Sequence, residues 1–242
     1  MLLRYTARMK WVLISVIVLA AVGGGVWIAA QKGYISLPQL PVRTPSLNRE
    51  VAFAEDASQE AKDAVSGKVA LNQDALKKDN TNIEAWLDLA IQYKQGGDIE
   101  GAIEIWEYLD TAFPGQSTSS FNLGVVHHQD LKEYEKSEQY YREAIRRSPL
   151  LPLGYLGLHE LYRYVYKTDT AAAVDILLEG IKQIPNEVNM PIALAAYYRD
   201  KKDYPEAIEY IEKAVTILKD TGGDVQKIQA LEGEAVRLGK LQ

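Results

Sequence analysis

The sequence contains no cysteine and only three histidines among 242 residues. It therefore forms no disulfide, holds no cysteine-ligated zinc or iron–sulfur centre and offers no thiolate nucleophile. His127 and His128 are adjacent, and adjacent side chains on a helix point about 100° apart, so they cannot readily hold one ion without a third ligand. We therefore expect no metal site and no cofactor.

The sequence also lacks the short motifs of common enzymes. It has no glycine-rich phosphate loop, no His-Glu-x-x-His zinc helix and no nucleophile-elbow motif. Carboxylates are plentiful, but their spacing is that of solvated helix faces, as in the i, i+4 pair Glu138 and Arg142. We therefore predict that the protein is not an enzyme.

Acidic residues are absent from the first part of the chain. Residues 1–49 contain six Lys or Arg and no Asp or Glu, whereas the whole chain carries a net charge of −6. Residues 50–242 therefore carry −12. So acidic a region repels phosphates, which argues against nucleic acid as the main ligand.

A long apolar run near the amino terminus predicts a membrane segment. Residues 11–30 contain a single polar side chain, Ser15, and twenty helical residues span about 30 Å, the thickness of a bilayer core. The basic residues in 1–10 favour a cytoplasmic amino terminus, with the bulk of the chain periplasmic or extracellular. The alternative is a cleavable signal peptide, because residues 21–23 form a small-x-small site.

Two connecting segments follow the apolar run. Residues 31–49 contain three prolines and no periodicity, which predicts an extended linker that reaches up to about 60 Å. Residues 50–82 are rich in helix-forming residues up to about Lys78, which predicts a flanking helix there, either one helix with a weak centre at Gly67 or two helices divided by it.

Self-similarity at a fixed period dominates the rest of the chain. Prolines 114, 149 and 185 are separated by 35 and 36 residues. Between them, a large residue, a Leu, a small residue and a Tyr recur at helical spacing, followed by a second helical set that starts with a small residue. The residues that carry this pattern are Trp86, Leu89, Ala90, Tyr93, Ala102, Trp106 and Leu109; Leu123, Gly124, Ser137, Tyr141 and Ala144; Tyr155, Leu158, Tyr162, Ala173, Leu177 and Gly180; and Leu194, Ala195, Tyr198, Ala207, Ile211 and Ala214.

These positions resemble the tetratricopeptide repeat. The resemblance implies an all-α solenoid of helix pairs that stack on one another, with repeats at 83–116, 117–151, 152–187 and 188–219 and a capping helix in 220–242. It also implies structural roles for six large residues: Trp86, Tyr93, Trp106, Leu123, Tyr162 and Tyr198.

Three residues depart from the repeat pattern. Ser120 stands where the family has Trp, and His127 where it has Tyr, so we predict that His127 is a packed residue. His159 stands where the family has a small side chain, which predicts distorted helix packing in the third repeat.

The resemblance implies that the first helix of each pair lines a concave groove for peptides or helices. The positions that project into it also include Asp88, Lys94, Leu156, Glu160, Ile192, Ala196 and Asp200. Our choices for partner contact are Leu87, Ile91, Phe121, Asn122, Val125, His128, Arg163, Tyr164 and Arg199.

One specialised ligand is excluded by the groove residues. A chaperone-binding subgroup grips a carboxy-terminal carboxylate with Lys, Asn, Asn, Lys and Arg. Those places here hold Leu87, Ile91, Asn122, Leu153 and Gly157, which is one match in five. An apolar groove suits an amphipathic helix or an apolar segment better than a charged peptide end.

The sequence thus predicts a membrane-anchored scaffold that binds a protein or peptide partner outside the cytoplasm. Two other occupants of the groove remain open: the chain's own helix at residues 50–79, and a second copy in a homo-oligomer. The rival function is an accessory subunit, or a weak enzyme, of cell-wall metabolism.

Overall fold

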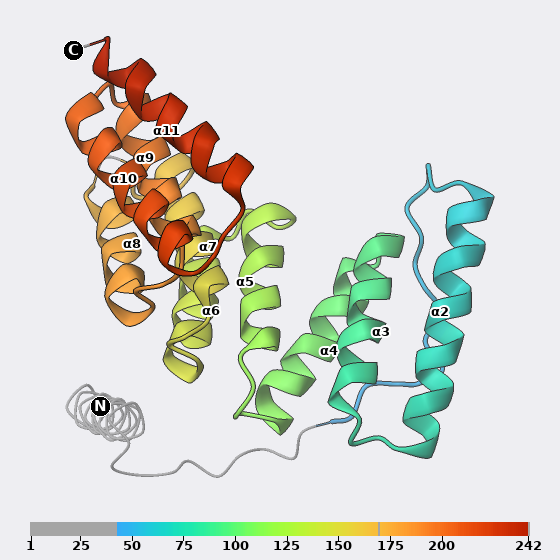
Figure 1. The fold of residues 1–242 in the computed structure, drawn as a ribbon. Helices are drawn as coiled ribbons and strands as arrows, with labels where there is room; N and C mark the ends of the chain where they lie inside the picture. Colours follow the sequence, from blue (N-terminus) through green and yellow to red (C-terminus); the bar gives the residue numbers. More distant parts are fainter. Residues whose placement is uncertain (1–42, 169, 242) are drawn as a thin grey trace, which may run out of the picture. The chain divides into compact units, whose positions relative to one another are not determined.

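The computed structural model describes residues 43–168 and 170–241 (Figure 1). Within these ranges the chain forms ten helices and no strand. The helices are α2 (Gln59–Lys78), α3 (Ile83–Gly96), α4 (Ile99–Ala112), α5 (Thr118–Gln129), α6 (Tyr134–Arg147), α7 (Pro152–Tyr164), α8 (Ala172–Gln183), α9 (Asn189–Asp200), α10 (Tyr204–Asp220) and α11 (Val225–Gly239).

The predicted membrane segment, residues 11–30, lies outside the described residues, as does the predicted linker up to residue 42. Among the helices at 43–168 and 170–241, none combines the length and apolar character that a membrane crossing needs.

Helices pair in chain order, and the pairs stack in series. α3 packs on α4, α5 on α6, α7 on α8 and α9 on α10, so each predicted repeat range holds one pair. The stacking contacts join α4 to α5, α6 to α7 and α8 to α9, and α11 packs on α10 (Figure 1). Small residues allow the close approach: a Cβ on Gly124 would lie 2.6 Å from the ring of Tyr141.

Large side chains fill the space between the helices. Trp86, Tyr93, Trp106, Leu123 and Tyr162 are all buried, whereas the sixth predicted structural residue is only half-buried. That residue, Tyr198, stacks on Tyr210 with the ring centroids 5.7 Å apart.

His159 fits into the third repeat without separating its helices. The imidazole is buried between α7 and α8, and its Nδ1 donates a hydrogen bond of 2.8 Å to the carbonyl of Ala173. The bond satisfies Nδ1, whereas the buried Nε2 has no hydrogen-bond partner within residues 43–168 and 170–241, and α7 still packs along α8. The predicted distortion is therefore not seen.

The segment before α2 differs from the prediction. The flanking helix begins at Gln59, where the Ser58 hydroxyl accepts a hydrogen bond from the Ala61 N–H, and it runs through Gly67 without a break. Residues 45–54 instead form a non-helical strap, with a turn at residues 47–48, that packs on the first repeat. Val51 lies so close to Gly96 that a Cβ there would be 2.5 Å from it, which leaves room only for glycine.

Arg49 ties the strap to a buried carboxylate. Its guanidinium donates two hydrogen bonds to Asp98, at 3.0 and 2.8 Å, and its carbonyl accepts from Tyr93 and Gln73. Burial raises the pKa of Asp98, but the hydrogen bonds from Arg49 and from the N–H groups of Gly101 and Ala52 outweigh it and hold that pKa below 3.8. Residues 45–49 therefore belong to the folded unit rather than to a free linker.

Candidate partner-binding groove

The first helices of the four pairs present one common face. α5 contacts α7, and α7 contacts α9, while α3 is joined to the end of α5 by an ion pair. On each helix, three positions spaced by four and then three residues share that face. We call these twelve positions the inner wall. Its three rows are the outer row Leu87, Phe121, Leu156 and Ile192; the middle row Ile91, Val125, Glu160 and Ala196; and the basic row Lys94, His128, Arg163 and Arg199.

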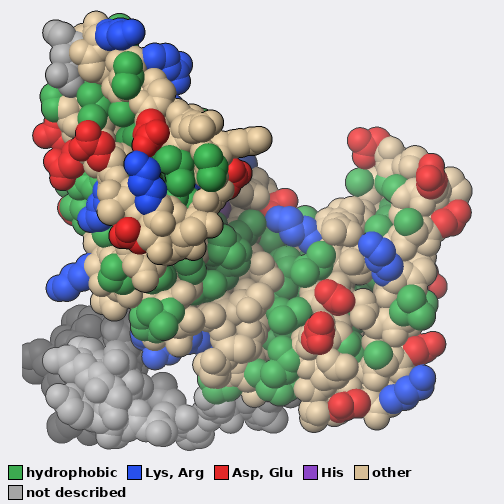
Figure 2. All heavy atoms as spheres, viewed as in Figure 1, with side chains coloured by type: hydrophobic (Ala, Val, Ile, Leu, Met, Phe, Trp, Pro, Cys, Tyr) green, Lys and Arg blue, Asp and Glu red, His purple; other side chains and the backbone are tan. Residues whose placement is uncertain are grey.

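The outer and middle rows are mainly apolar and remain partly open to solvent. All four outer-row residues are half-buried, and Ile91 is 37% exposed. Phe121 leans on the core with its ring 5.8 Å from that of Tyr141. Figure 2 shows hydrophobic side chains gathered in the hollow of the molecule over α5. The wall therefore offers apolar surface that rigid helices hold in place.

The basic row is bound within the chain. Lys94 Nζ lies 2.5 Å from the Asp130 carboxylate, and Arg199 Nη1 lies 2.8 Å from that of Glu234. Arg163 binds the carboxylate of Asp200. Each pair joins a first helix to the next helix pair or to α11, at a separation of 35 to 37 residues. Three cations of the wall are thus already neutralised.

His128 is the fourth member of the basic row. Its Nδ1 is buried and has no hydrogen-bond partner among the described residues. Burial lowers the pKa of His128 below 6.5, the Glu160 carboxylate opposes that shift, and Lys132 adds to it. At pH 7 the imidazole is therefore neutral. Two aromatic rings, Tyr134 and Tyr141, stand edge-on to it at 6.4 Å each.

The other predicted contact residues lie on or beside the wall. Leu87 is partly buried against the hydrophobic cluster of the first repeat, which includes Trp86. Asn122 is half-buried and follows Phe121 in the chain. Tyr164 follows the basic row on α7 and is 62% exposed, with the Arg163 guanidinium 4.9 Å from its ring centroid.

All nine predicted contact residues lie on the first helices of the pairs. However, Arg163 and Arg199 already form ion pairs with acidic residues of the same chain. The sequence analysis did not identify the partner acids Asp130 and Glu234. A basic residue on one first helix and an acidic residue 35 or 36 positions later was the pattern that could have predicted these ion pairs.

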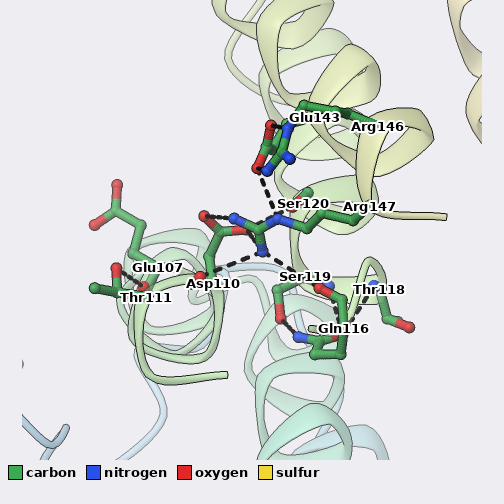
Figure 3. A network of polar contacts seen from close by, with 10 residues as sticks. All are labelled: Glu107, Asp110, Thr111, Gln116, Thr118, Ser119, Ser120, Glu143, Arg146 and Arg147. Carbon is green, nitrogen blue, oxygen red and sulfur yellow. Dashed lines mark hydrogen bonds and ion pairs between the residues drawn. The ribbon is translucent and has the colours of Figure 1, made fainter. Parts of the chain in front are cut away.

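A polar cluster fixes the start of α5, and with it the centre of the wall (Figure 3). Arg147, on α6, lies 2.8 Å from Asp110 of α4 and also donates to the carbonyl of Gln116. Ser120, in place of the family's Trp, donates a 2.5 Å hydrogen bond to Asp110. The arginine side chain is only 9% exposed, so these bonds replace the water it has lost.

The flanking helix does not cover the centre of the wall. α2 packs on α3 at the first end of the solenoid and makes no extensive contact with α5, α7 or α9 within the described ranges (Figure 1). The inner-wall residues of α5 and α7 are therefore not filled by residues 59–78.

Comparison with known proteins gives the same repeat. Residues 87–152 and residues 192–221 each match a family model described as tetratricopeptide repeat. No curated protein matches the chain significantly.

Similar solved structures share the fold. A crystal structure of MamA is 20% identical, covers 68% of this chain and 94% of its own, and has a TM-score of 0.52. A thermophilic TPR protein of Thermus thermophilus is 18% identical, covers 73% of this chain and 98% of its own, and has a TM-score of 0.50. At these identities the likeness concerns the fold alone. The family models, the neighbours and the helix pairs together identify the described part of this chain as an all-α solenoid of the tetratricopeptide-repeat type.

Proposed function

We propose that this protein is a non-enzymatic scaffold whose inner wall binds an apolar or amphipathic segment of a protein partner. The observation that carries the proposal is the half-buried apolar row Leu87, Phe121, Leu156 and Ile192, which continues across four consecutive first helices. A contiguous apolar surface of this kind on a folded domain marks a contact site. An amphipathic helix fits such a wall because its own apolar residues recur on one face.

We further propose that residues 11–30 anchor the chain in a membrane and that the solenoid works outside the cytoplasm. The support is the apolar run in the sequence and the basic residues before it. Because the strap begins at residue 45, few residues remain to separate an anchor from the solenoid. Residues 31–44 reach at most about 50 Å when fully extended, at roughly 3.5 Å each. A partner would then be held close to the bilayer.

Site-specific photocrosslinking of the full chain tests the scaffold. A photoreactive residue at Asn122 or Val125 faces the proposed partner, and one at the exposed position Gln139 on α6 serves as the control. We expect both wall positions to capture the same protein and the control to capture none of it. Capture of residues 59–78 of the same chain would show that the protein fills its own groove. Capture of a second copy of the chain would show that the groove is the contact of a homo-oligomer. Either result contradicts a separate protein partner.

A further inference from the structure

The charge of the inner wall is not what its residue types indicate. Three of its four basic-row side chains are neutralised by Asp130, Asp200 and Glu234, and the fourth, His128, is uncharged at pH 7. The basic row therefore offers little positive charge to a ligand.

Two acids, one in the wall and one beside it, have no cation paired with them among the described residues. Glu160 stands in the middle row of α7, and Asp88 lies three residues before Ile91 on the same face of α3. Both are exposed, and neither has an ion-pair partner or a hydrogen-bonded side chain within residues 43–168 and 170–241. The surplus charge beside the apolar rows is therefore negative.

We propose that the partner segment is a cationic amphipathic helix, with Lys or Arg along the edges of its apolar face. This rests on the proposed function and adds the charge of the ligand to it. The apolar face packs on the outer and middle rows, and the basic residues reach Glu160 and Asp88. The net charge of −12 on residues 50–242 attracts the same ligand from a distance.

The size of the wall fits a helix. At a typical helix spacing of about 9 Å, the contacting helices α5, α7 and α9 present a surface roughly 18 Å long, and α3 extends it beyond α5, so a helix of about 18 residues, roughly 27 Å long, can lie along the wall. An acidic helix of the same length meets Glu160 and Asp88 with like charge, and the cations that could balance it are already paired. The structure therefore discriminates between the two charges.

Binding of designed peptides tests the proposal. The probe is a fluorescent amphipathic peptide of Leu, Ala and Lys, about 18 residues long, and two matched peptides carry Glu or Gln in place of every Lys. Fluorescence anisotropy measures their affinity for the full chain in nanodiscs of zwitterionic lipid, with empty nanodiscs as the background. We expect the Lys peptide to bind at least about tenfold more tightly than the Glu peptide at low salt, with the difference shrinking as salt rises.

Substitutions of single residues test whether the charge preference arises from Glu160 and Asp88. E160Q and D88N should each weaken the Lys peptide about threefold to tenfold and leave the Gln peptide unchanged, while E135Q on the exposed face of α6 should change neither. Ile91→Ser removes an apolar contact and should weaken all three peptides. Equal or tighter binding of the Glu peptide, or loss of the Lys peptide in E135Q alone, overturns the cationic ligand. No effect of Ile91→Ser on any bound peptide overturns the proposed function itself.

Discussion

The first two repeats have the same shape but are held together by different chemistry. In the first repeat, Trp86, Tyr93 and Trp106 fill the space between α3 and α4 and are all buried. In the second repeat, the places of Trp86 and Tyr93 hold Ser120 and His127, which are also buried. Each has a hydrogen-bond partner: Ser120 donates to Asp110, and His127 Nδ1 donates to Glu133 over 2.8 Å.

The comparison shows what a repeat needs at these positions. In the first repeat, large aromatic rings fill the space between the two helices. In the second repeat, hydrogen-bonded polar side chains are buried at the same positions. An apolar position loses stability through the cavity that a smaller side chain leaves, whereas a polar cluster loses it when one member leaves its partners buried and unpaired. Substitutions of four residues, with Arg146 as a matched control, test apolar and polar stabilisation in turn, from the largest expected effect to the smallest.

Trp86→Ala should have the largest effect. It removes a fully buried indole together with its hydrogen bond to the Asn80 carbonyl, and we expect a loss of about 3–5 kcal/mol in the free energy of unfolding. Denaturant titration followed by circular dichroism measures it. Because the mechanism is a cavity, the loss should not depend on salt; a loss below about 1 kcal/mol would contradict it.

Arg147→Ala should come second, at about 2–4 kcal/mol, because Asp110 and the Gln116 carbonyl lose a partner in a poorly solvated place. Its neighbour Arg146 is the matched control: both arginines bind the Glu143 carboxylate, but the side chain of Arg146 is 70% exposed. Arg146→Ala should cost less than about 0.5 kcal/mol. Equal losses for the two arginines would show that the cluster does not stabilise the junction of the repeats.

Arg49→Ala tests the ion pair that holds the strap on the first repeat. The substitution releases the strap and leaves the Asp98 carboxylate with only backbone donors, so we expect a loss of about 1–2 kcal/mol. Hydrogen exchange should rise at Ala52 and Ala54, whose N–H groups are bonded to Asp98 and to the Gly96 carbonyl. If exchange in the strap stays unchanged, Arg49 is not what holds it.

The smallest expected effect is a pH dependence. Burial lowers the pKa of His159 below 6.5, so the unfolded chain binds protons that the folded chain does not, and stability falls as the pH drops below about 6.5. His128 is shifted in the same direction. His159→Asn keeps a donor for the Ala173 carbonyl but does not titrate, so it should flatten part of the slope between pH 7.5 and about 5.5. Lowered carboxyl pKa values, such as that of Glu138, act only below about 4.5. If the stability of His159→Asn depends on pH as steeply as that of the wild type, other groups cause the pH dependence.

The sequence predicted the repeat and most of the inner wall because both depend on short-range spacing. Large and small residues three and four positions apart define a helix face, and the period of 35 or 36 residues defines the pair. The resemblance to the tetratricopeptide repeat, projected onto those helices, implied Leu87, Ile91, Phe121 and Val125 as wall residues. Composition alone was a poorer guide before α2, where a helix-forming run from Glu50 is not helical until Gln59 and contains a turn at residues 55–56.

The sequence by itself therefore determined which segments are helices and which face of each is apolar, because these properties arise from residues within a few turns of one another. Only the tertiary structure decided which charges are free. Arg163 and Arg199 look like ligand contacts in the sequence, but the stacking of the pairs brings Asp200 and Glu234, 37 and 35 residues away, against them. The same packing draws Arg49 to Asp98 across 49 residues. Such pairs depend on how the helices stack, and no local pattern encodes that.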